Sequence, residues 1–221
     1  MNKGVYTDRI RETDVGIIMR TTKLTERKKK AMTTHLKIYR TALRLFEKEG
    51  FDKVTVDQVC KKAGVSKGTF YVYFRSKEQV VLDLFSTTDK MYDDFVANEL
   101  ASVSDPMEKL ILLVRKALSY TVEKGPDLME ASYRARASLH RSGNPRLTES
   151  RAIYKIVIKL VEEAHRRGYI RKDLSANEVA PLLIRTFEGL IHDWCMENGS
   201  YDLIDETEKA IIILRNGLRP R

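Results

Sequence analysis

The sequence has few residues that could form disulfides or bind metal ions. Its 221 residues include only two cysteines, Cys60 and Cys195, which stand far apart and within apolar helical patterns. We therefore expect two buried thiols in a reducing compartment rather than a disulfide framework. None of the four histidines pairs with a cysteine or a carboxylate at the spacing of a metal site. The sequence predicts no metal centre.

Long apolar runs and catalytic motifs are also missing. No stretch reaches the roughly 18 apolar residues of a membrane span, and the N-terminal residues lack the apolar core of a secretory signal. Phosphate-binding loops, dinucleotide fingerprints and nucleophile elbows are absent. We expect a cytoplasmic protein with no membrane contact, no cofactor and no enzymatic activity.

No segment alternates apolar and polar residues over the length of a strand, whereas apolar residues recur at three- and four-residue spacing almost throughout. The pattern predicts an all-α protein of about nine helices. Their approximate ranges are 32–48, 56–63, 67–74, 77–100, 106–124, 127–140, 148–167, 176–197 and 203–218.

Positive charge is concentrated in the first part of the chain. Residues 1–81 hold 19 Lys and Arg against 9 Asp and Glu, a net charge of +10, whereas residues 82–221 hold 21 against 22. A polyanionic partner for the first part is the simplest reading, because binding to phosphates releases counterions. The alternative is a basic tail kept for solubility, which accounts for Arg27–Lys30 but not for the segment that follows.

That segment, Thr55–Lys77, predicts two short helices joined by a tight turn. Thr55 and Ser66 stand where each helix needs an N-cap, and Gly64 stands where a left-handed residue ends the first helix. Phe70 and Phe74 are four residues apart and are assigned to the core. The pattern over 55–74 is that of a helix-turn-helix, whose second helix enters the DNA major groove.

Such geometry also arises as plain packing, so the surface of the second helix matters. It is expected to expose small, polar and aromatic residues, namely Gly68, Thr69, Tyr71 and Tyr73. Basic residues flank this face at Lys61, Lys62, Lys67, Arg75 and Lys77. Both features favour contact with nucleic acid.

The stretch GFDKVTVDQVCKKAGVSKGTFYVYFRSKEQVV, preceded by TALRLFEKEG, resembles the DNA-binding domain of the TetR family of bacterial transcriptional regulators. The strong resemblance covers roughly residues 33–84, and the remainder matches in length and helix pattern. It implies a helix-turn-helix domain over 31–80 and an effector-binding and dimerisation domain over 81–221. Residues 1–30 have a mixed composition and end in a basic run, so we expect a disordered basic arm that either contacts DNA or is a solvated tail.

The resemblance also implies which residues contact DNA. Residues at the helix starts would face phosphate or bases, and the two tyrosines of the second helix would reach the backbone or base edges. The implied set is Thr55, Ser66, Lys67, Gly68, Thr69, Tyr71, Tyr73 and Lys77. Asp57 departs from the pattern, since some members place a base-reading arginine there, so readout would rest mainly on the second helix.

For the rest of the chain the resemblance implies a repressor released from a palindromic operator when a small-molecule effector shifts the helix that begins near residue 77. An apolar pocket for an apolar or acidic effector would be lined by Tyr92, Phe95, Met129, Tyr133, Phe187 and Trp194, with Arg136 and His140 as polar anchors. For each of these residues ordinary core packing is the alternative.

A homodimer through the last two helices is expected, because two heads on a two-fold axis read a palindrome. The expected interface residues are Leu183, Leu190, Trp194, Ile211, Leu214 and Leu218. They could instead serve the core of one subunit. Two other readings of the whole chain remain open: a non-specific, nucleoid-type DNA-binding protein without an effector, and a helical interaction module whose helix-turn-helix is structural.

Overall fold

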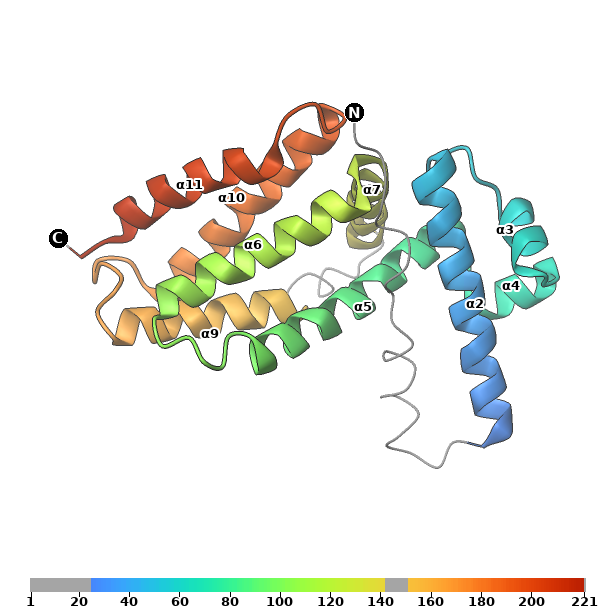
Figure 1. The fold of residues 1–221 in the computed structure, drawn as a ribbon, viewed down its shortest axis with the longest axis horizontal. Helices are drawn as coiled ribbons and strands as arrows, with labels where there is room; N and C mark the ends of the chain where they lie inside the picture. Colours follow the sequence, from blue (N-terminus) through green and yellow to red (C-terminus); the bar gives the residue numbers. More distant parts are fainter. Residues whose placement is uncertain (1–24, 142–150, 221) are drawn as a thin grey trace.

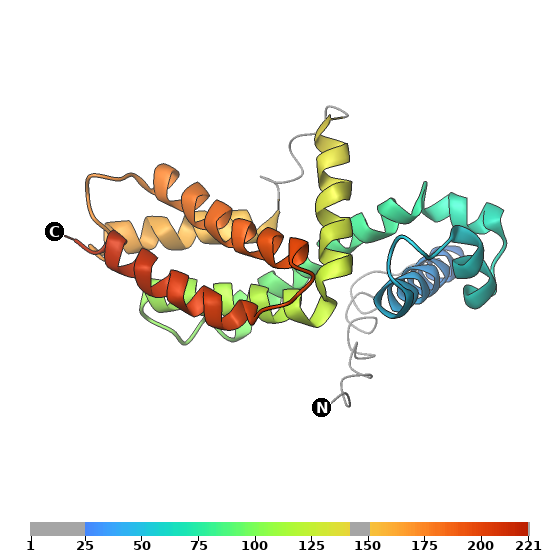
Figure 2. The same cartoon turned by 90° about the horizontal axis from the view of Figure 1, so that it is seen from above.

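The computed structural model describes residues 25–141 and 151–220, apart from the side chains of residues 85, 86, 139 and 140. Within these ranges the chain forms nine α-helices and no strand. Figures 1 and 2 show an elongated molecule, with α2, α3 and α4 at one end and α6, α9, α10 and α11 at the other. α5 and α7 lie between the two ends. The predicted all-α fold is confirmed.

The N-terminal domain consists of α2 (Glu26–Glu49), α3 (Val56–Ala63) and α4 (Lys67–Tyr73). Thr25 N-caps α2 by accepting a hydrogen bond from the Lys28 amide at 3.4 Å. The basic run that follows Thr25 therefore forms the first turns of α2, and the prediction that it belongs to a disordered arm is wrong. The remainder of that predicted arm, 1–24, lies outside the described residues.

The core of this domain also includes part of the C-terminal half. Ile38, Phe46 and Phe70 are almost fully buried in one cluster that also contains Leu128 and Ala131. The last two residues belong to α7 (Pro126–Arg141). The N-terminal domain is therefore seated on α7 as well as continuous with α5 (Lys77–Asn98), so the predicted division at 80/81 falls inside a shared core.

The remaining helices are α6 (Pro106–Lys124), α9 (Ala152–Arg166), α10 (Ala176–Met196) and α11 (Leu203–Leu218). Their starts follow from sequence signals: Asp105 caps α6 at 2.8 Å from the Met107 amide, and Ser175 forms a capping box with Glu178. The predicted start of α9 near residue 148 falls outside the described residues. No described helix is long and apolar enough to cross a membrane.

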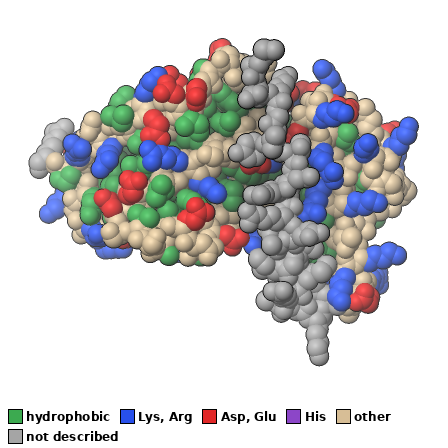
Figure 3. Space-filling view, viewed as in Figure 1, with side chains coloured by type: hydrophobic (Ala, Val, Ile, Leu, Met, Phe, Trp, Pro, Cys, Tyr) green, Lys and Arg blue, Asp and Glu red, His purple; other side chains and the backbone are tan. Residues whose placement is uncertain are grey.

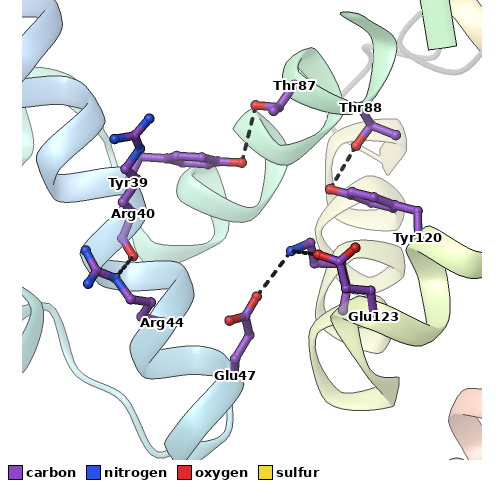
Figure 4. Close-up of polar contacts among 9 residues, drawn as sticks. Tyr39, Arg40, Arg44, Glu47, Thr87, Thr88, Tyr120 and Glu123 are labelled. Atoms are coloured by element: carbon purple, nitrogen blue, oxygen red, sulfur yellow. Dashed lines mark hydrogen bonds and ion pairs between the residues drawn. The ribbon is translucent and has the colours of Figure 1, made fainter. Parts of the chain in front are cut away.

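Polar contacts tie α2 to α5 and α6 across the domain junction (Figure 4). The hydroxyls of Tyr39 and Thr87 lie 3.4 Å apart. The Lys124 ammonium at the end of α6 lies 3.4 Å from a Glu47 carboxylate oxygen of α2. Two helices of the C-terminal half thus contact α2, the helix that packs on α3 and α4.

Candidate nucleic-acid interface and internal cavity

The helix-turn-helix has the local geometry that its residues predict. The Thr55 side chain accepts from the Gln58 amide at 3.3 Å, while the Gln58 side chain accepts from the Thr55 amide at 2.7 Å. Gly64 ends α3 with φ of 61°, a left-handed conformation that glycine adopts without a Cβ clash. Ser66 caps α4 by accepting from the Thr69 amide at 3.0 Å. These contacts fix the orientation of α4 relative to α3.

One face of α4 points into the core and the other to solvent. Phe70 is buried, and so is Phe74 directly after the helix. The exposed residues are Lys67, Gly68, Tyr71 and Val72. Their spacing places them in one stripe along the helix. In Figure 3 Lys and Arg side chains outnumber acidic ones over α2 and the helices beside it. The stripe and its basic surroundings are the candidate DNA-binding surface.

The predicted exposed face of α4 is confirmed for Gly68 and Tyr71 but not for Thr69 and Tyr73. Tyr73 is half-buried, with its ring edge-on to His35 at 5.9 Å between centroids. Thr69 is also half-buried, and its hydroxyl lies 2.9 Å from that of Ser66. Val72, which sequence reasoning omitted, is 76% exposed. Its position four residues after Gly68 was the signal available in the sequence.

Asp57 and Lys67 form an ion pair at 2.7 Å between α3 and α4, and both side chains are exposed. The carboxylate that departs from the family pattern therefore has a cationic partner within the motif. Exposed pairs of this kind contribute little to stability, so the Lys67 ammonium remains able to exchange this partner for a phosphate.

Lys77 has a role other than the one implied by resemblance. Its ammonium donates hydrogen bonds to the backbone carbonyls of Phe51, Asp52 and Val54 at 2.8, 3.2 and 3.2 Å. It also lies 4.4 Å from the centroid of the Phe51 ring. An ammonium has three donors, and all three are used, so the prediction that this group binds phosphate is not supported by the geometry.

The C-terminal half contains a partly open cavity of about 160 Å³, lined by residues from α5, α6, α7, α9, α10 and α11. Five of the predicted effector residues line it: Tyr92, Met129, Tyr133, Arg136 and Phe187. Sequence reasoning missed the contribution of α6, which supplies many lining residues, among them Leu110, Leu113, Val114, Ala117 and Tyr120.

Two predicted pocket residues lie elsewhere. Phe95 is buried beneath the Lys116 ammonium, which is 5.2 Å from its ring centroid. Trp194 packs in a separate cluster and donates its indole N–H to the Tyr201 carbonyl at 3.1 Å. The predicted anchor His140 has its side chain outside the described residues.

Polar side chains interrupt the apolar lining, and three of them form one hydrogen-bonded cluster. Arg136 donates to a Glu188 carboxylate oxygen at 2.9 Å, and the Tyr154 hydroxyl donates to the other oxygen at 3.3 Å. Burial, helped by the charge of Glu188, raises the pKa of Tyr154 to about 12, so the phenol stays protonated. The Arg136 and Glu188 charges compensate each other, and the cluster presents polar groups to the cavity without a net charge.

The predicted dimer residues divide between the core and the cavity. Trp194, Ile211 and Leu218 are buried within the chain, so their assignment to an interface is wrong. Leu183 and Leu214 are half-buried and line the cavity, and Leu190 is half-buried against the Trp194 cluster. The large aliphatic side chains that α10 and α11 do expose are Leu182, Met196, Ile212 and Ile213.

Among the described residues no group of three or more His, Cys, Asp or Glu could hold a metal ion. The site is thus a helix-turn-helix with an exposed polar and apolar stripe, joined to a helical domain with an internal apolar cavity. This combination defines a DNA-binding regulator that senses a small molecule.

Comparison with known proteins extends this conclusion. The family model for bacterial regulatory proteins of the tetR family matches residues 38–84, and the model for the YsiA-like protein C-terminal region matches residues 85–217. The chain belongs to the TetR family of bacterial regulators. It is a ligand-responsive DNA-binding transcriptional regulator, which sets aside the nucleoid-type and purely structural alternatives.

Three similar proteins illustrate the range of the family. The fatty acid metabolism regulator protein of Bacillus subtilis (strain 168) is 22% identical over 187 residues, which are 83% of this chain and 95% of that protein. The HTH-type transcriptional regulator TtgR of Pseudomonas putida is 26% identical over 190 residues, 83% of this chain and 90% of that one. The structure of Thermus thermophilus FadR, a TetR family transcriptional repressor in complex with lauroyl-CoA, aligns with 26% identity and a TM-score of 0.62, covering 85% of this chain and 96% of that chain.

Proposed function

We propose that this chain is a homodimeric repressor that leaves its operator when an acyl thioester of coenzyme A enters the cavity. The mainly apolar lining, in which the Arg136 charge is compensated by Glu188, is the observation that carries the proposal. The similarity to a FadR solved with lauroyl-CoA supports the same ligand class. A neutral thioester fits this cavity because an acyl chain needs apolar walls and its carbonyl needs a hydrogen-bond donor.

The charge-compensated cluster disfavours a free carboxylate. Glu188 already occupies Arg136 at 2.9 Å, so a second carboxylate at that point would meet an anion and lose its water shell without gaining a free cation. A carbonyl oxygen needs only a share of the Arg136 or Tyr154 donors. Exposed Arg215 lines the cavity from α11, which gives the phosphates of a nucleotide headgroup a cation to approach.

The size of the cavity requires its walls to move. Binding sites for larger ligands commonly occupy roughly 300–1,000 Å³, whereas this cavity measures about 160 Å³. A long acyl chain should therefore bind more tightly to a state in which the lining helices have separated. Differential affinity for two states is what allows a ligand to shift an equilibrium.

The lining helices also contact the DNA-binding head. Tyr120 of α6 and Thr88 of α5 both line the cavity, and their hydroxyl oxygens lie 3.2 Å apart (Figure 4). Thr87, the residue before Thr88, has its hydroxyl 3.4 Å from that of Tyr39 of α2. Lys124, one turn after Tyr120, forms an ion pair with Glu47 of α2. Separation of α5 from α6 would therefore displace α2 and, with it, the recognition helix.

The exposed aliphatic residues of α10 and α11 support the dimer. Ile212 and Ile213 are 59% and 70% exposed on α11, and Leu182 is 55% exposed on α10. A monomer gains nothing by exposing them, whereas a second copy would bury them. Ile213→Asp should convert a dimer into a monomer in light scattering at micromolar concentration, and a wild-type monomer would contradict the dimer proposal.

The effector test measures operator release. Labelled operator DNA, obtained by selection from a random duplex library, is bound by the protein and titrated with lauroyl-CoA, lauric acid or coenzyme A while fluorescence anisotropy is recorded. We expect lauroyl-CoA to release the DNA and the other two compounds to have little effect.

A cavity-filling variant tests the site. Ala117 lines the cavity from α6, whereas Ala97 is exposed on α5. Ala117→Phe should retain DNA binding and lose the response to lauroyl-CoA, and Ala97→Phe should retain both. A wild-type response from Ala117→Phe, or no release by any acyl-CoA, would rule out the acyl thioester in this cavity.

A further inference from the structure

Gly68 is a glycine that the fold itself does not require. It lies within α4 and is not among the glycines with positive φ. A Cβ at this position would meet only the Ser66 Oγ, at the ordinary contact distance of 3.7 Å. Glycine is the poorest helix former after proline, so the chain keeps a weak helix residue where alanine would fit. No contact among the described residues accounts for the glycine.

Val72 stands one turn after Gly68 on the same exposed face of α4. Its side chain is 76% exposed, the largest fraction among the exposed large apolar residues of the described chain. Polar or charged residues are the usual choice at such a position. The exposed Val72 side chain lies next to Gly68, which has no side chain. We call this apolar recess the Gly68–Val72 notch.

The notch lies on the helix that enters the major groove. There, thymine alone among the four bases presents an apolar group, its C5-methyl. We propose that the Gly68–Val72 notch receives the C5-methyl group of one thymine in each operator half-site, with Val72 packing on the methyl and Gly68 leaving room for it. The inference rests on the DNA-binding function of the chain and makes Val72 a specificity-determining residue.

The neighbouring side chains of the stripe fit a different task. Lys67 and Tyr71 are exposed beside the notch and carry an ammonium and a hydroxyl, which suit phosphates and polar base edges. Their polar groups cannot discriminate thymine from uracil, because the two bases have the same polar edge. The exposed Tyr71 ring is apolar, so the methyl sensitivity is assigned to Val72 by its loss in Val72→Ala.

The experiment replaces thymine by deoxyuridine, which removes the methyl group and nothing else. Each thymine of the selected operator is replaced in turn, and affinity is measured without effector. We expect one position per half-site to lose roughly fourfold in affinity for the wild-type protein, the factor that corresponds to burying one methyl group. In Val72→Ala that position should become insensitive to the replacement.

Two further variants sharpen the test. Val122 is an exposed valine on α6, and Val122→Ala should keep the wild-type sensitivity. Gly68→Ala should raise the melting temperature while weakening the thymine operator, because its new methyl competes for the notch. For this variant the deoxyuridine operator should bind more tightly than the thymine operator, a reversal of the wild-type order.

The proposal is overturned if no deoxyuridine replacement weakens wild-type binding, or if Val72→Ala keeps the wild-type sensitivity at the affected position. Circular dichroism and thermal unfolding establish that each variant is folded before binding is measured. Failure of the acyl thioester proposal would leave all of these values unchanged, since no effector is present.

Discussion

The ammonium of Lys77 provides a direct test of whether resemblance or geometry assigns this residue correctly. Lys77→Met removes the charge and keeps most of the apolar stem. The three carbonyls of Phe51, Asp52 and Val54 would lose donors at 2.8 to 3.2 Å. Hydrogen bonds to a charged donor contribute about 1.5–3 kcal/mol, and water can reach this half-buried site, so we expect a total loss of about 2 kcal/mol.

For a chain of this length, 1 kcal/mol corresponds to roughly 2–4 °C in melting temperature. We therefore expect Lys77→Met to melt roughly 4–8 °C below the wild type in differential scanning calorimetry. Lys53 lies in the same loop and is exposed, so Lys53→Met is the matched control. Its expected effect is within about 0.5 kcal/mol.

The DNA measurement separates the two roles of Lys77. A lysine that neutralises a phosphate contributes about one unit to the slope of log affinity against log salt concentration. We expect Lys77→Met to leave that slope unchanged when binding is measured well below its melting temperature. An unchanged melting temperature with a slope reduced by one unit would refute the structural role and restore the phosphate contact.

The remaining predictions concern charge and pH. Asp57→Asn frees Lys67 from its exposed pair and should raise affinity for random-sequence DNA by roughly two- to fivefold, as measured by anisotropy at low salt; equal affinities would mean that the pair does not compete with DNA. Burial raises the pKa of Tyr120 to about 12, above that of an unfolded tyrosine. Stability from this phenol is therefore present below pH 10 and decreases as the pH rises toward 12, so urea unfolding from pH 9 to 11.5 should show a smaller loss for Tyr120→Phe than for the wild type. Glu188→Gln removes the carboxylate that lies 2.9 Å from Arg136, so lauric acid should bind at least about tenfold more tightly in calorimetry; unchanged affinity would place the ligand away from this cluster.

Local signals in the sequence carried the prediction of the helix-turn-helix. Thr55, Gly64 and Ser66 act through their own backbone and that of residues three or four positions away. Such contacts need no knowledge of the rest of the fold. The starts of α5 and α6 were predictable for the same reason, because Ser76 and Asp105 cap the backbone of residues two or three positions on.

Contacts between distant segments were not predictable. Lys77 reaches carbonyls that stand 23 to 26 residues earlier, and Tyr73 packs on His35 of α2. Each side chain looked available on its own helix, because spacing shows which residues share a face but not what covers that face. The geometry of α2 against α4 had to be known first.

The C-terminal half shows a related limit. An apolar residue on an amphipathic helix can face the core, a cavity or a partner subunit, and all three give the same periodicity. Trp194 and Phe95 fill the core, Phe187 lines the cavity, and Ile213 is exposed. Only the three-dimensional packing distinguishes core, cavity and interface residues. The predicted pocket and interface sets therefore each included residues that belong to the core.

α7 couples the cavity to the DNA-binding domain, because its residues belong to both. Met129 and Tyr133 line the cavity from this helix, whereas Leu128 and Ala131 lie in the core of the N-terminal domain. Leu128 and Met129 are consecutive, so one rigid turn of helix is a wall of both compartments. Interiors packed at this density do not absorb displacement locally. A ligand that moves the cavity wall must therefore either shift the head with it or break a core in which Leu128 is 1% exposed. Breaking that core would cost the burial of Leu128, so we expect the head to shift and operator affinity to depend on occupancy of the cavity.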